Sequence, residues 1–202
     1  MIFISRIGLI AGLIALPLAA QMIQKSWDPS VPLTAEGKAA RALKLMLPPG
    51  GAIGSLIGAG FDQLDNYPRE WGQGAKGYGH RFLSLYGRRA ADNALSLGLS
   101  VAMKTEPRYD RCDCKGFTPR LGHALLRTVW VRRDNGGEIV NVPLLAGFVG
   151  GAAIANQWNP ERIRTGGTIA RSAGIDIGRE TGQLVLTEFW PEIRKKLPFV
   201  KK

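Results

Sequence analysis

The sequence has few residues of the kinds that carry metal-ion or nucleophilic chemistry. Its 202 residues include only two histidines and two cysteines. Cys112 and Cys114 are separated by a single residue, which is closer than the spacing typical of zinc ligands. The nucleophile-elbow pattern Gly-x-Ser-x-Gly and the phosphate-binding ending Gly-Lys-Ser/Thr are both missing. We therefore expect no metal site, no cofactor and no serine or cysteine nucleophile.

Negative charge is scarce as well. The chain has 16 aspartates and glutamates against 27 lysines and arginines, a net charge of +11 at neutral pH. This excess of positive charge indicates an anionic partner, either nucleic acid or an anionic membrane surface or polymer. Long hydrophobic runs are few, and after the N-terminus only residues 139–155 approach the length of a membrane span. They contain Pro143.

The N-terminus decides between those partners. Residues 1–20 have one basic residue, Arg6, followed by an apolar run that ends in Ala19 and Ala20. This layout predicts a secretory signal peptide. The alternative is an uncleaved anchor, although the apolar run is shorter than the roughly 20 residues that span a bilayer. Either way the rest of the chain is expected outside the cytoplasm, which excludes nucleic acid as a partner.

Proline, glycine and apolar spacing divide the remaining chain. Residues 21–33 are predicted to be a linker, residues 34–197 a single helical domain and residues 198–202 a basic tail. Residues 62–79 are predicted to be a loop. The turn sequence from Asp134 to Gly137 predicts a short β-hairpin, although its first arm also fits the end of a helix. Capping signals and proline stops predict helices over residues 34–47, 80–103, 118–130, 143–156 and 168–190. The fold class is mainly α, a compact bundle of about five to six helices.

Small residues recur four positions apart along several predicted helices. The clearest case is the uncharged segment 143–158, in which Gly147, Gly151 and Ala155 form one side-chain-poor stripe. Such a stripe lets another helix approach closely. Because each glycine costs a helix about 1 kcal/mol relative to alanine, a packing partner is expected. Glycine-zipper-like packing is predicted, with further stripes at Gly54, Gly58, Gly87, Ala91, Gly98, Gly174, Gly178 and Gly182.

His123 is the strongest candidate for chemistry. It lies three residues after Arg120, on the same face of a predicted helix. With Asp92 from the preceding helix it would form an acid/base centre for an anionic substrate such as a phosphoester. The alternative is a hydrogen-bonded structural histidine. Outside the cytoplasm, Cys112 and Cys114 are expected to oxidise, either to a local disulfide or to bridges with a second chain.

A set of short motifs spans residues 61–197. They are FDQ from Phe61, EWGQGA from Glu70, GYG from Gly77, EPRY from Glu106, GHAL from Gly122, Asn156 with Trp158 and Pro160, and EFWPEI from Glu188. In these motifs the chain resembles an uncharacterised family of bacterial exported proteins. The resemblance implies an envelope protein and no catalytic residue, because no activity is established for that family. Cys112 and Cys114 are not part of the family pattern.

These observations lead to one preferred function and two alternatives. The preferred function is an exported envelope protein, periplasmic or outer-membrane-associated, with a structural or lipid- or partner-binding role through close helix packing. Its partners would be membrane lipids, envelope proteins or a second copy of the chain. Charges in the middle of two predicted helices favour docking on a membrane over spanning it. The alternatives are a periplasmic hydrolase that uses His123, and a soluble basic adaptor that binds an anionic envelope polymer.

Overall fold

The structure, a computed structural model, describes residues 31–47 and 50–196. The predicted signal peptide, most of the predicted linker and the basic tail lie outside these residues. The described part is mainly helical, with six α-helices and a two-stranded antiparallel sheet, which confirms the predicted helical bundle. The helices are α3 (Ala35–Met46), α4 (Gly50–Leu64), α5 (Gly74–Ala102), α6 (Phe117–Val129), α7 (Val142–Asn156) and α8 (Gly166–Lys196).

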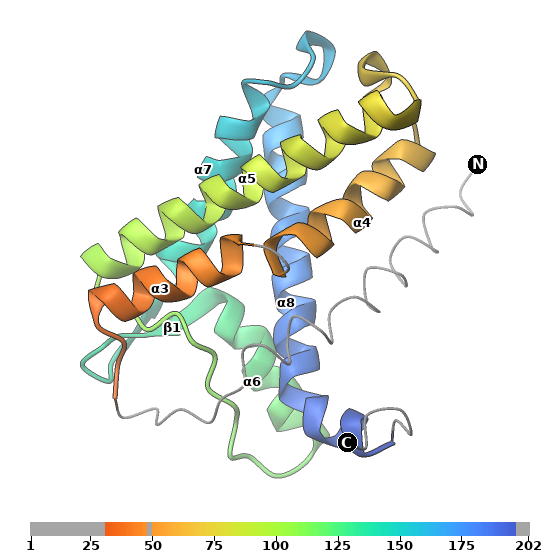
Figure 1. Cartoon of the computed structure of the whole chain (residues 1–202). Helices are drawn as coiled ribbons and strands as arrows, with labels where there is room; N and C mark the ends of the chain where they lie inside the picture. Colours follow the sequence, from red (N-terminus) through yellow and green to blue (C-terminus); the bar gives the residue numbers. More distant parts are fainter. Residues whose placement is uncertain (1–30, 48–49, 197–202) are drawn as a thin grey trace.

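Two long helices, α5 and α8, organise the bundle (Figure 1). Helices α3 and α4 follow one another along α5, and α7 also packs against α5. Helix α8 crosses behind α5 in this view and packs against α7 and α6. The 3₁₀ turns η1 (Arg69–Trp71) and η2 (Glu161–Ile163) lie in the connections before α5 and before α8. The four shorter helices therefore each pack against at least one of the two long ones.

The predicted hairpin is present and short. Strands β1 (Trp130–Arg132) and β2 (Glu138–Val140) pair in antiparallel register, with Val131 opposite Ile139. Gly136 in the turn has φ 88°, a conformation that favours glycine. Thr105 bridges to Arg133 just beyond β1, so the loop after α5 is attached to the hairpin.

Local capping signals account for several helix starts. The Thr34 hydroxyl accepts a hydrogen bond from Gly37 N at 3.1 Å, as expected for an N-cap. The Asn141 side chain caps α7 by accepting from Leu144 N at 3.3 Å, and Pro143 lies in the first turn, where its missing N–H costs nothing. The helix predicted from residue 118 begins slightly earlier, because α6 starts after Gly116, whose φ of 94° turns the chain into the helix.

The predicted loop over residues 62–79 is wrong at both ends. Helix α4 continues to Leu64, and α5 begins at Gly74 rather than at residue 80. The cause is a long-range anchor that helical periodicity does not reveal. Arg81 is fully buried and donates to the backbone carbonyls of Tyr67 at 2.8 Å, Pro68 at 3.0 Å and Gly72 at 2.7 Å. These bonds fold residues 67–72 tightly over the start of α5.

The predicted stop at Pro191 is also wrong, because α8 continues to Lys196 with Pro191 inside it. A proline removes one backbone hydrogen bond and ordinarily kinks or ends a helix. The residues on either side of Pro191 are held by the rest of the protein. Trp190 is buried, at 6% exposed, and Glu192 accepts a hydrogen bond from Arg120 of α6 at 2.7 Å.

The close helix contact predicted for glycine is found between α5 and α7. A side chain at Gly147 would collide with Ser96 and lie 3.0 Å from the Asp92 carbonyl oxygen. A side chain at Gly151 would collide with the Asp92 carboxylate. Ala155, one turn further, is 5% exposed. This face of α7 therefore has room only for glycine or alanine where it meets α5.

Two further predicted packing glycines face side chains across helix contacts. A Cβ at Gly54 of α4 would lie 2.9 Å from the Arg89 guanidinium, and one at Gly87 of α5 would lie 3.6 Å from the Trp158 ring. Ala91 of α5 is half-buried. Glycine at these positions therefore makes room for a large neighbouring side chain.

Gly58 of α4 is also at a helix contact, since a Cβ there would lie 3.0 Å from Leu85.

The predicted stripe along α8 does not pack in this way. Within the described part of the chain, a Cβ would meet nothing within 4 Å at Gly98, Gly174, Gly178 or Gly182. The three glycines of α8 therefore contribute nothing to the close approach of described helices, and a zipper along the whole bundle is not shown.

The interior of the bundle contains mostly small apolar side chains together with several large polar ones. Six of the buried apolar residues among those described are alanines: Ala42, Ala59, Ala124, Ala152, Ala155 and Ala173. The largest fully buried side chains are polar, namely Arg81, Thr105, Asp176 and Glu188. A buried polar group is costly unless it is hydrogen-bonded, so the partners of these side chains mark where the fold is held together.

Candidate functional site

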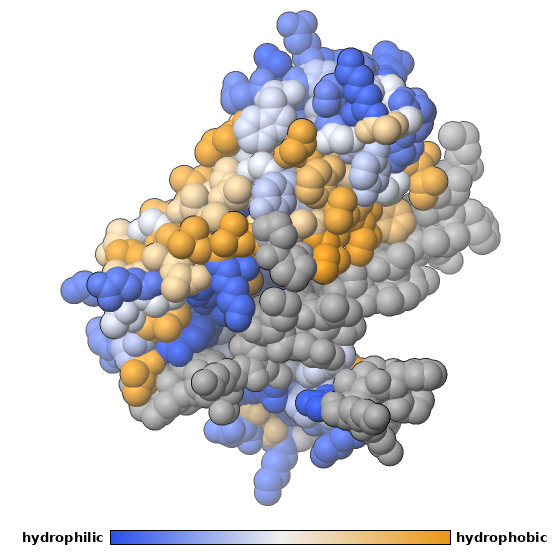
Figure 2. Space-filling model, viewed as in Figure 1, coloured by the Kyte–Doolittle hydropathy of each residue, from blue (hydrophilic) through white to orange (hydrophobic). Residues whose placement is uncertain are grey.

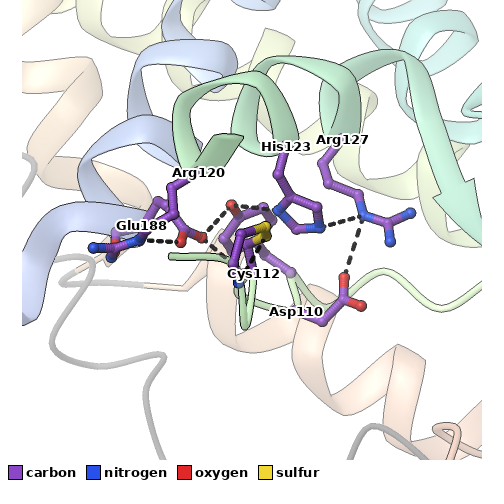
Figure 3. Close-up of a disulfide and its surroundings, with 8 residues drawn as sticks. Asp110, Cys112, Arg120, His123, Arg127 and Glu188 are labelled. Atoms are coloured by element: carbon purple, nitrogen blue, oxygen red, sulfur yellow. Dashed lines mark hydrogen bonds and ion pairs between the residues drawn. A yellow bond between two sulfur atoms is a disulfide. The ribbon is translucent and has the colours of Figure 1, made fainter. Parts of the chain in front are cut away.

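His123 lies on α6 in a chain of side-chain hydrogen bonds (Figure 3). Arg127 Nε donates to His123 Nε2 at 3.2 Å, and His123 Nδ1 is 3.3 Å from the Tyr109 hydroxyl. Arginine always donates, so Nε2 must accept and Nδ1 carries the proton of the neutral ring. The Tyr109 hydroxyl then accepts from Nδ1 and donates to Glu188 at 2.7 Å. Both ring nitrogens are engaged by protein groups, which is the arrangement of a structural histidine.

Glu188 of α8 is the centre of this network, and it is fully buried. Besides Tyr109, it accepts from Arg120 Nε at 2.9 Å and from Cys112 N at 3.2 Å. Burial, together with the hydrogen bond to Glu188, raises the pKa of Tyr109, so the phenol stays a neutral donor. A buried carboxylate with three donors is well satisfied. Glu188 thereby ties α8 to α6 and to the loop after α5.

Cys112 and Cys114 are joined in a disulfide within that loop. The bridge lies beside the hydrogen-bonded network in Figure 3, attached to Glu188 through the backbone of Cys112. Asp110 precedes it and pairs with Arg127 at 3.5 Å and with Arg132 of β1. The loop is therefore fixed by a covalent link and by charged contacts to α6, β1 and α8.

Asp92 lies elsewhere, in the interface of α5 with α7 and α8. Its side chain is 4% exposed, it faces Gly151, and its Oδ1 has no hydrogen-bond partner among the described residues. Burial and the neighbouring Asp176 raise its pKa to about 7. Asp176 of α8 is fully buried and lies within ion-pair distance of Arg88, at 3.4 Å, and of Arg179, at 3.0 Å.

The three residues proposed as an acid/base centre are therefore divided between two networks. His123 and Arg120 belong to the network around Glu188, where Arg120 also pairs with Glu192 at 2.7 Å. Asp92 belongs to the α5–α7–α8 interface and shares no contact with them. Within residues 31–47 and 50–196, no three histidine, cysteine, aspartate or glutamate side chains form a group suited to a metal ion.

A cavity of about 130 Å³ opens beside the network around Glu188. It lies where α3, the loop after α5, the hairpin, α7 and α8 meet. Five basic and three acidic side chains line it: Lys38, Arg41, Arg108, Arg127, Arg132, Glu106, Asp110 and Glu180. At this size it holds several waters or one small ligand rather than a single water.

An apolar surface covers the α3–α4–α5 side of the bundle. Figure 2 shows hydrophobic residues gathered over the face on which α3 and α4 lie. We call this the apolar face and define it by the exposed leucines of α3, its C-cap, α4 and α5, namely Leu43 (55% exposed), Leu47 (57%), Leu56 (40%), Leu64 (76%) and Leu83 (63%). Exposed leucines gathered on one face, unlike scattered ones, mark an interaction surface. No described helix combines the length and apolar character that crossing a bilayer requires.

Sequence reasoning missed four residues that the structure places in or beside these sites: Arg41, Thr105, Tyr109 and Glu188. Tyr109 and Glu188 stand in two of the recognised motifs, EPRY and EFWPEI, so the motifs themselves were the available signal. For Arg41 and Thr105 there was no such signal, because their environment is made by elements far apart in the chain.

Comparison of the chain with protein-family models, with curated proteins and with solved structures finds no match in any of the three. Function must therefore be argued from the geometry alone.

Proposed function

We propose that this chain is an exported envelope protein that docks on a membrane surface through the apolar face and catalyses no reaction. The observation that carries the proposal is the set of five exposed leucines on α3, its C-cap, α4 and α5. Burying one such side chain contributes about 2 kcal/mol, so several together make a substantial membrane affinity. The polar side chains in the middle of α5 and α8 favour docking on the surface over insertion.

Charge supports the same proposal. The net charge of +11 attracts the chain to anionic lipid before the leucines engage. Basic residues near such a surface contribute about 1 kcal/mol each, and salt weakens this contribution. The apolar contribution is not screened by salt, so the two can be separated by experiment.

The first test is fractionation of washed membranes. The proposal predicts that the protein stays with the membranes in high salt. Release by salt alone would contradict it and would favour the soluble basic adaptor. The hydrolase alternative gains no support from the geometry, because both nitrogens of His123 are bound by Tyr109 and Arg127.

A second test asks whether vesicle binding depends on the apolar face itself, and not on any exposed apolar residue or on the N-terminal segment. Leu64→Ser is expected to weaken binding to vesicles of phosphatidylglycerol and phosphatidylcholine roughly tenfold, because about 1–2 kcal/mol of apolar burial is lost. Leu126→Ser is the matched control, since Leu126 is 60% exposed but lies on α6, outside the apolar face. Equal losses in the two variants in a cosedimentation assay would sink the assignment of this face.

A further inference from the structure

Arg41 stands out among the basic residues that line the cavity between α3 and α8. Lys38 is paired with Asp134 at 2.7 Å, and Arg108 is paired with Glu106 at 2.7 Å. The other two, Arg127 and Arg132, are paired with Asp110. Arg41, in contrast, makes no hydrogen bond or ion pair with any residue in the described part of the chain.

The charge of Arg41 is poorly compensated. Burial lowers its pKa, and the more distant carboxyl groups of Glu180 and Glu106 act in the opposite direction. Burial also raises the pKa of Glu180. Arg41 is half-buried, and a guanidinium that is partly withdrawn from water and has five donors but no acceptor is costly. A bound oxyanion would remove that cost.

Thr105 gives a second, independent indication. It lines the same cavity, its side chain is 1% exposed, and its hydroxyl has no partner among the described residues. Buried hydroxyls are ordinarily hydrogen-bonded to protein, water or ligand. Its backbone is held in place by the bridge to Arg133 and by a bond to Ser100 O at 3.0 Å, so the hydroxyl is presented from a fixed position.

We propose that this cavity binds a small oxyanion, a carboxylate or phosphate group, which Arg41 and the Thr105 hydroxyl hold. A guanidinium matches the planar oxygens of such groups with two parallel hydrogen bonds, and a hydroxyl donates a third. Trp130, which is 42% exposed, is among the lining residues, so the site is at the surface of the protein. This site is separate from the apolar face and does not depend on docking to a membrane.

The test measures binding of inorganic phosphate and of malonate to the full chain, by calorimetry and by thermal shift at constant ionic strength. Both ligands bind the folded state only, so binding raises the melting temperature. We expect Arg41→Gln to lower the affinity for both anions at least tenfold, and Thr105→Val to lower it several-fold. Lys76→Gln, which removes one exposed positive charge outside the cavity, is expected to leave the affinity unchanged.

Stability without ligand separates a binding role from a structural one. If Arg41 serves a ligand, Arg41→Gln melts at or above the wild-type temperature in chloride alone, because it removes a half-buried charge that has no partner among the described residues. A lower melting temperature for Arg41→Gln in chloride would show a structural role and overturn the proposal. The proposal would also be overturned if neither anion raised the wild-type melting temperature more than sodium chloride does. Equal losses of anion affinity in Arg41→Gln and Lys76→Gln would overturn it as well.

The source of the oxyanion is decided by a parallel measurement with phosphatidylglycerol vesicles. If the group belongs to a lipid, Arg41→Gln binds these vesicles less tightly than Lys76→Gln does, and soluble glycerol phosphate competes. If the ligand is a free small molecule, the two variants bind vesicles equally and only the soluble anions distinguish them. If Leu64→Ser does not affect vesicle binding, that result contradicts the proposed docking through the apolar face and not the oxyanion site.

Discussion

At the scale of single residues, glycines with the same four-residue spacing have opposite surroundings. A Cβ added at Gly151 of α7 would collide with the backbone and carboxylate of Asp92, whereas one added at Gly178 of α8 would meet no described atom of another element within 4 Å. Spacing on a helix shows that small residues share a face, but it does not show whether another helix covers that face. Substitution by alanine distinguishes the two.

We expect Gly151→Ala to destabilise the protein by about 2–3 kcal/mol, because the new Cβ would lie 2.8 Å from the backbone nitrogen of Asp92, which has little room to move. Gly178→Ala is the matched control and should stabilise by up to about 1 kcal/mol, through its better helix propensity. Urea denaturation followed by circular dichroism measures both. A Gly151→Ala protein as stable as Gly178→Ala would contradict the packing of α7 on α5.

At the scale of elements, α6 and α8 are joined by a pair of carboxylates that differ in burial. Arg120 of α6 donates to both Glu188, which is fully buried, and Glu192, whose side chain is 51% exposed. Ion pairs at the surface contribute little, while removing one partner of a buried pair leaves the other uncompensated. The junction therefore depends on Glu188 far more than on Glu192.

Glu188→Gln should destabilise the protein by about 2–3 kcal/mol, because the amide group must place an N–H donor among Tyr109, Cys112 N and Arg120, which all donate to this position. Glu192→Gln should change the unfolding free energy by no more than about 0.5 kcal/mol. Thermal and urea unfolding measure the difference. Similar effects of the two substitutions would show that Glu188 does not hold the junction.

At the scale of the whole molecule, buried carboxyl groups set the pH dependence of stability. Burial raises the pKa of Asp62 to about 6 and, with Asp176 nearby, that of Asp92 to about 7. A carboxyl whose folded pKa exceeds its unfolded value binds protons more tightly when folded, so it costs stability as the pH rises toward 7. Glu106 acts in the opposite sense. Burial alone raises its pKa, but hydrogen bonds from Arg108 and a backbone N–H lower it overall.

We therefore expect the unfolding free energy to be highest near about pH 4, to fall between about pH 4 and pH 7 because the unfolded chain releases protons that folded Asp92 and Asp62 retain, and to fall below about pH 4 as Glu106 is protonated. Asp92→Asn should be more stable than the wild type at pH 8 and should flatten the decline between about pH 4 and pH 7, since each unit of pKa shift corresponds to about 1.4 kcal/mol. Asp113→Asn, at an exposed position, is the control. Equal stability of the wild type from pH 5 to pH 8 in urea titrations would contradict this assignment.

The sequence by itself determined the fold class, most helix positions and the hairpin. The Thr34 cap, Pro143 and the turn from Asp134 to Gly137 act on residues only a few positions away, so their effect can be read without knowing the rest of the chain. The excess of positive charge and the scarcity of histidine and cysteine are likewise properties of composition.

Only the tertiary structure decided which side chains meet. It placed Asp92 against Gly151 rather than beside His123, left open space around the predicted packing glycines of α8, and brought Arg41 and Thr105 to one cavity. Each of these outcomes depends on how long helices cross, and a small rotation of a helix changes the whole set of facing residues. Local hydrogen bonding and propensity do not specify that rotation. It is set by packing between residues distant in sequence and by the need to partner each buried charge.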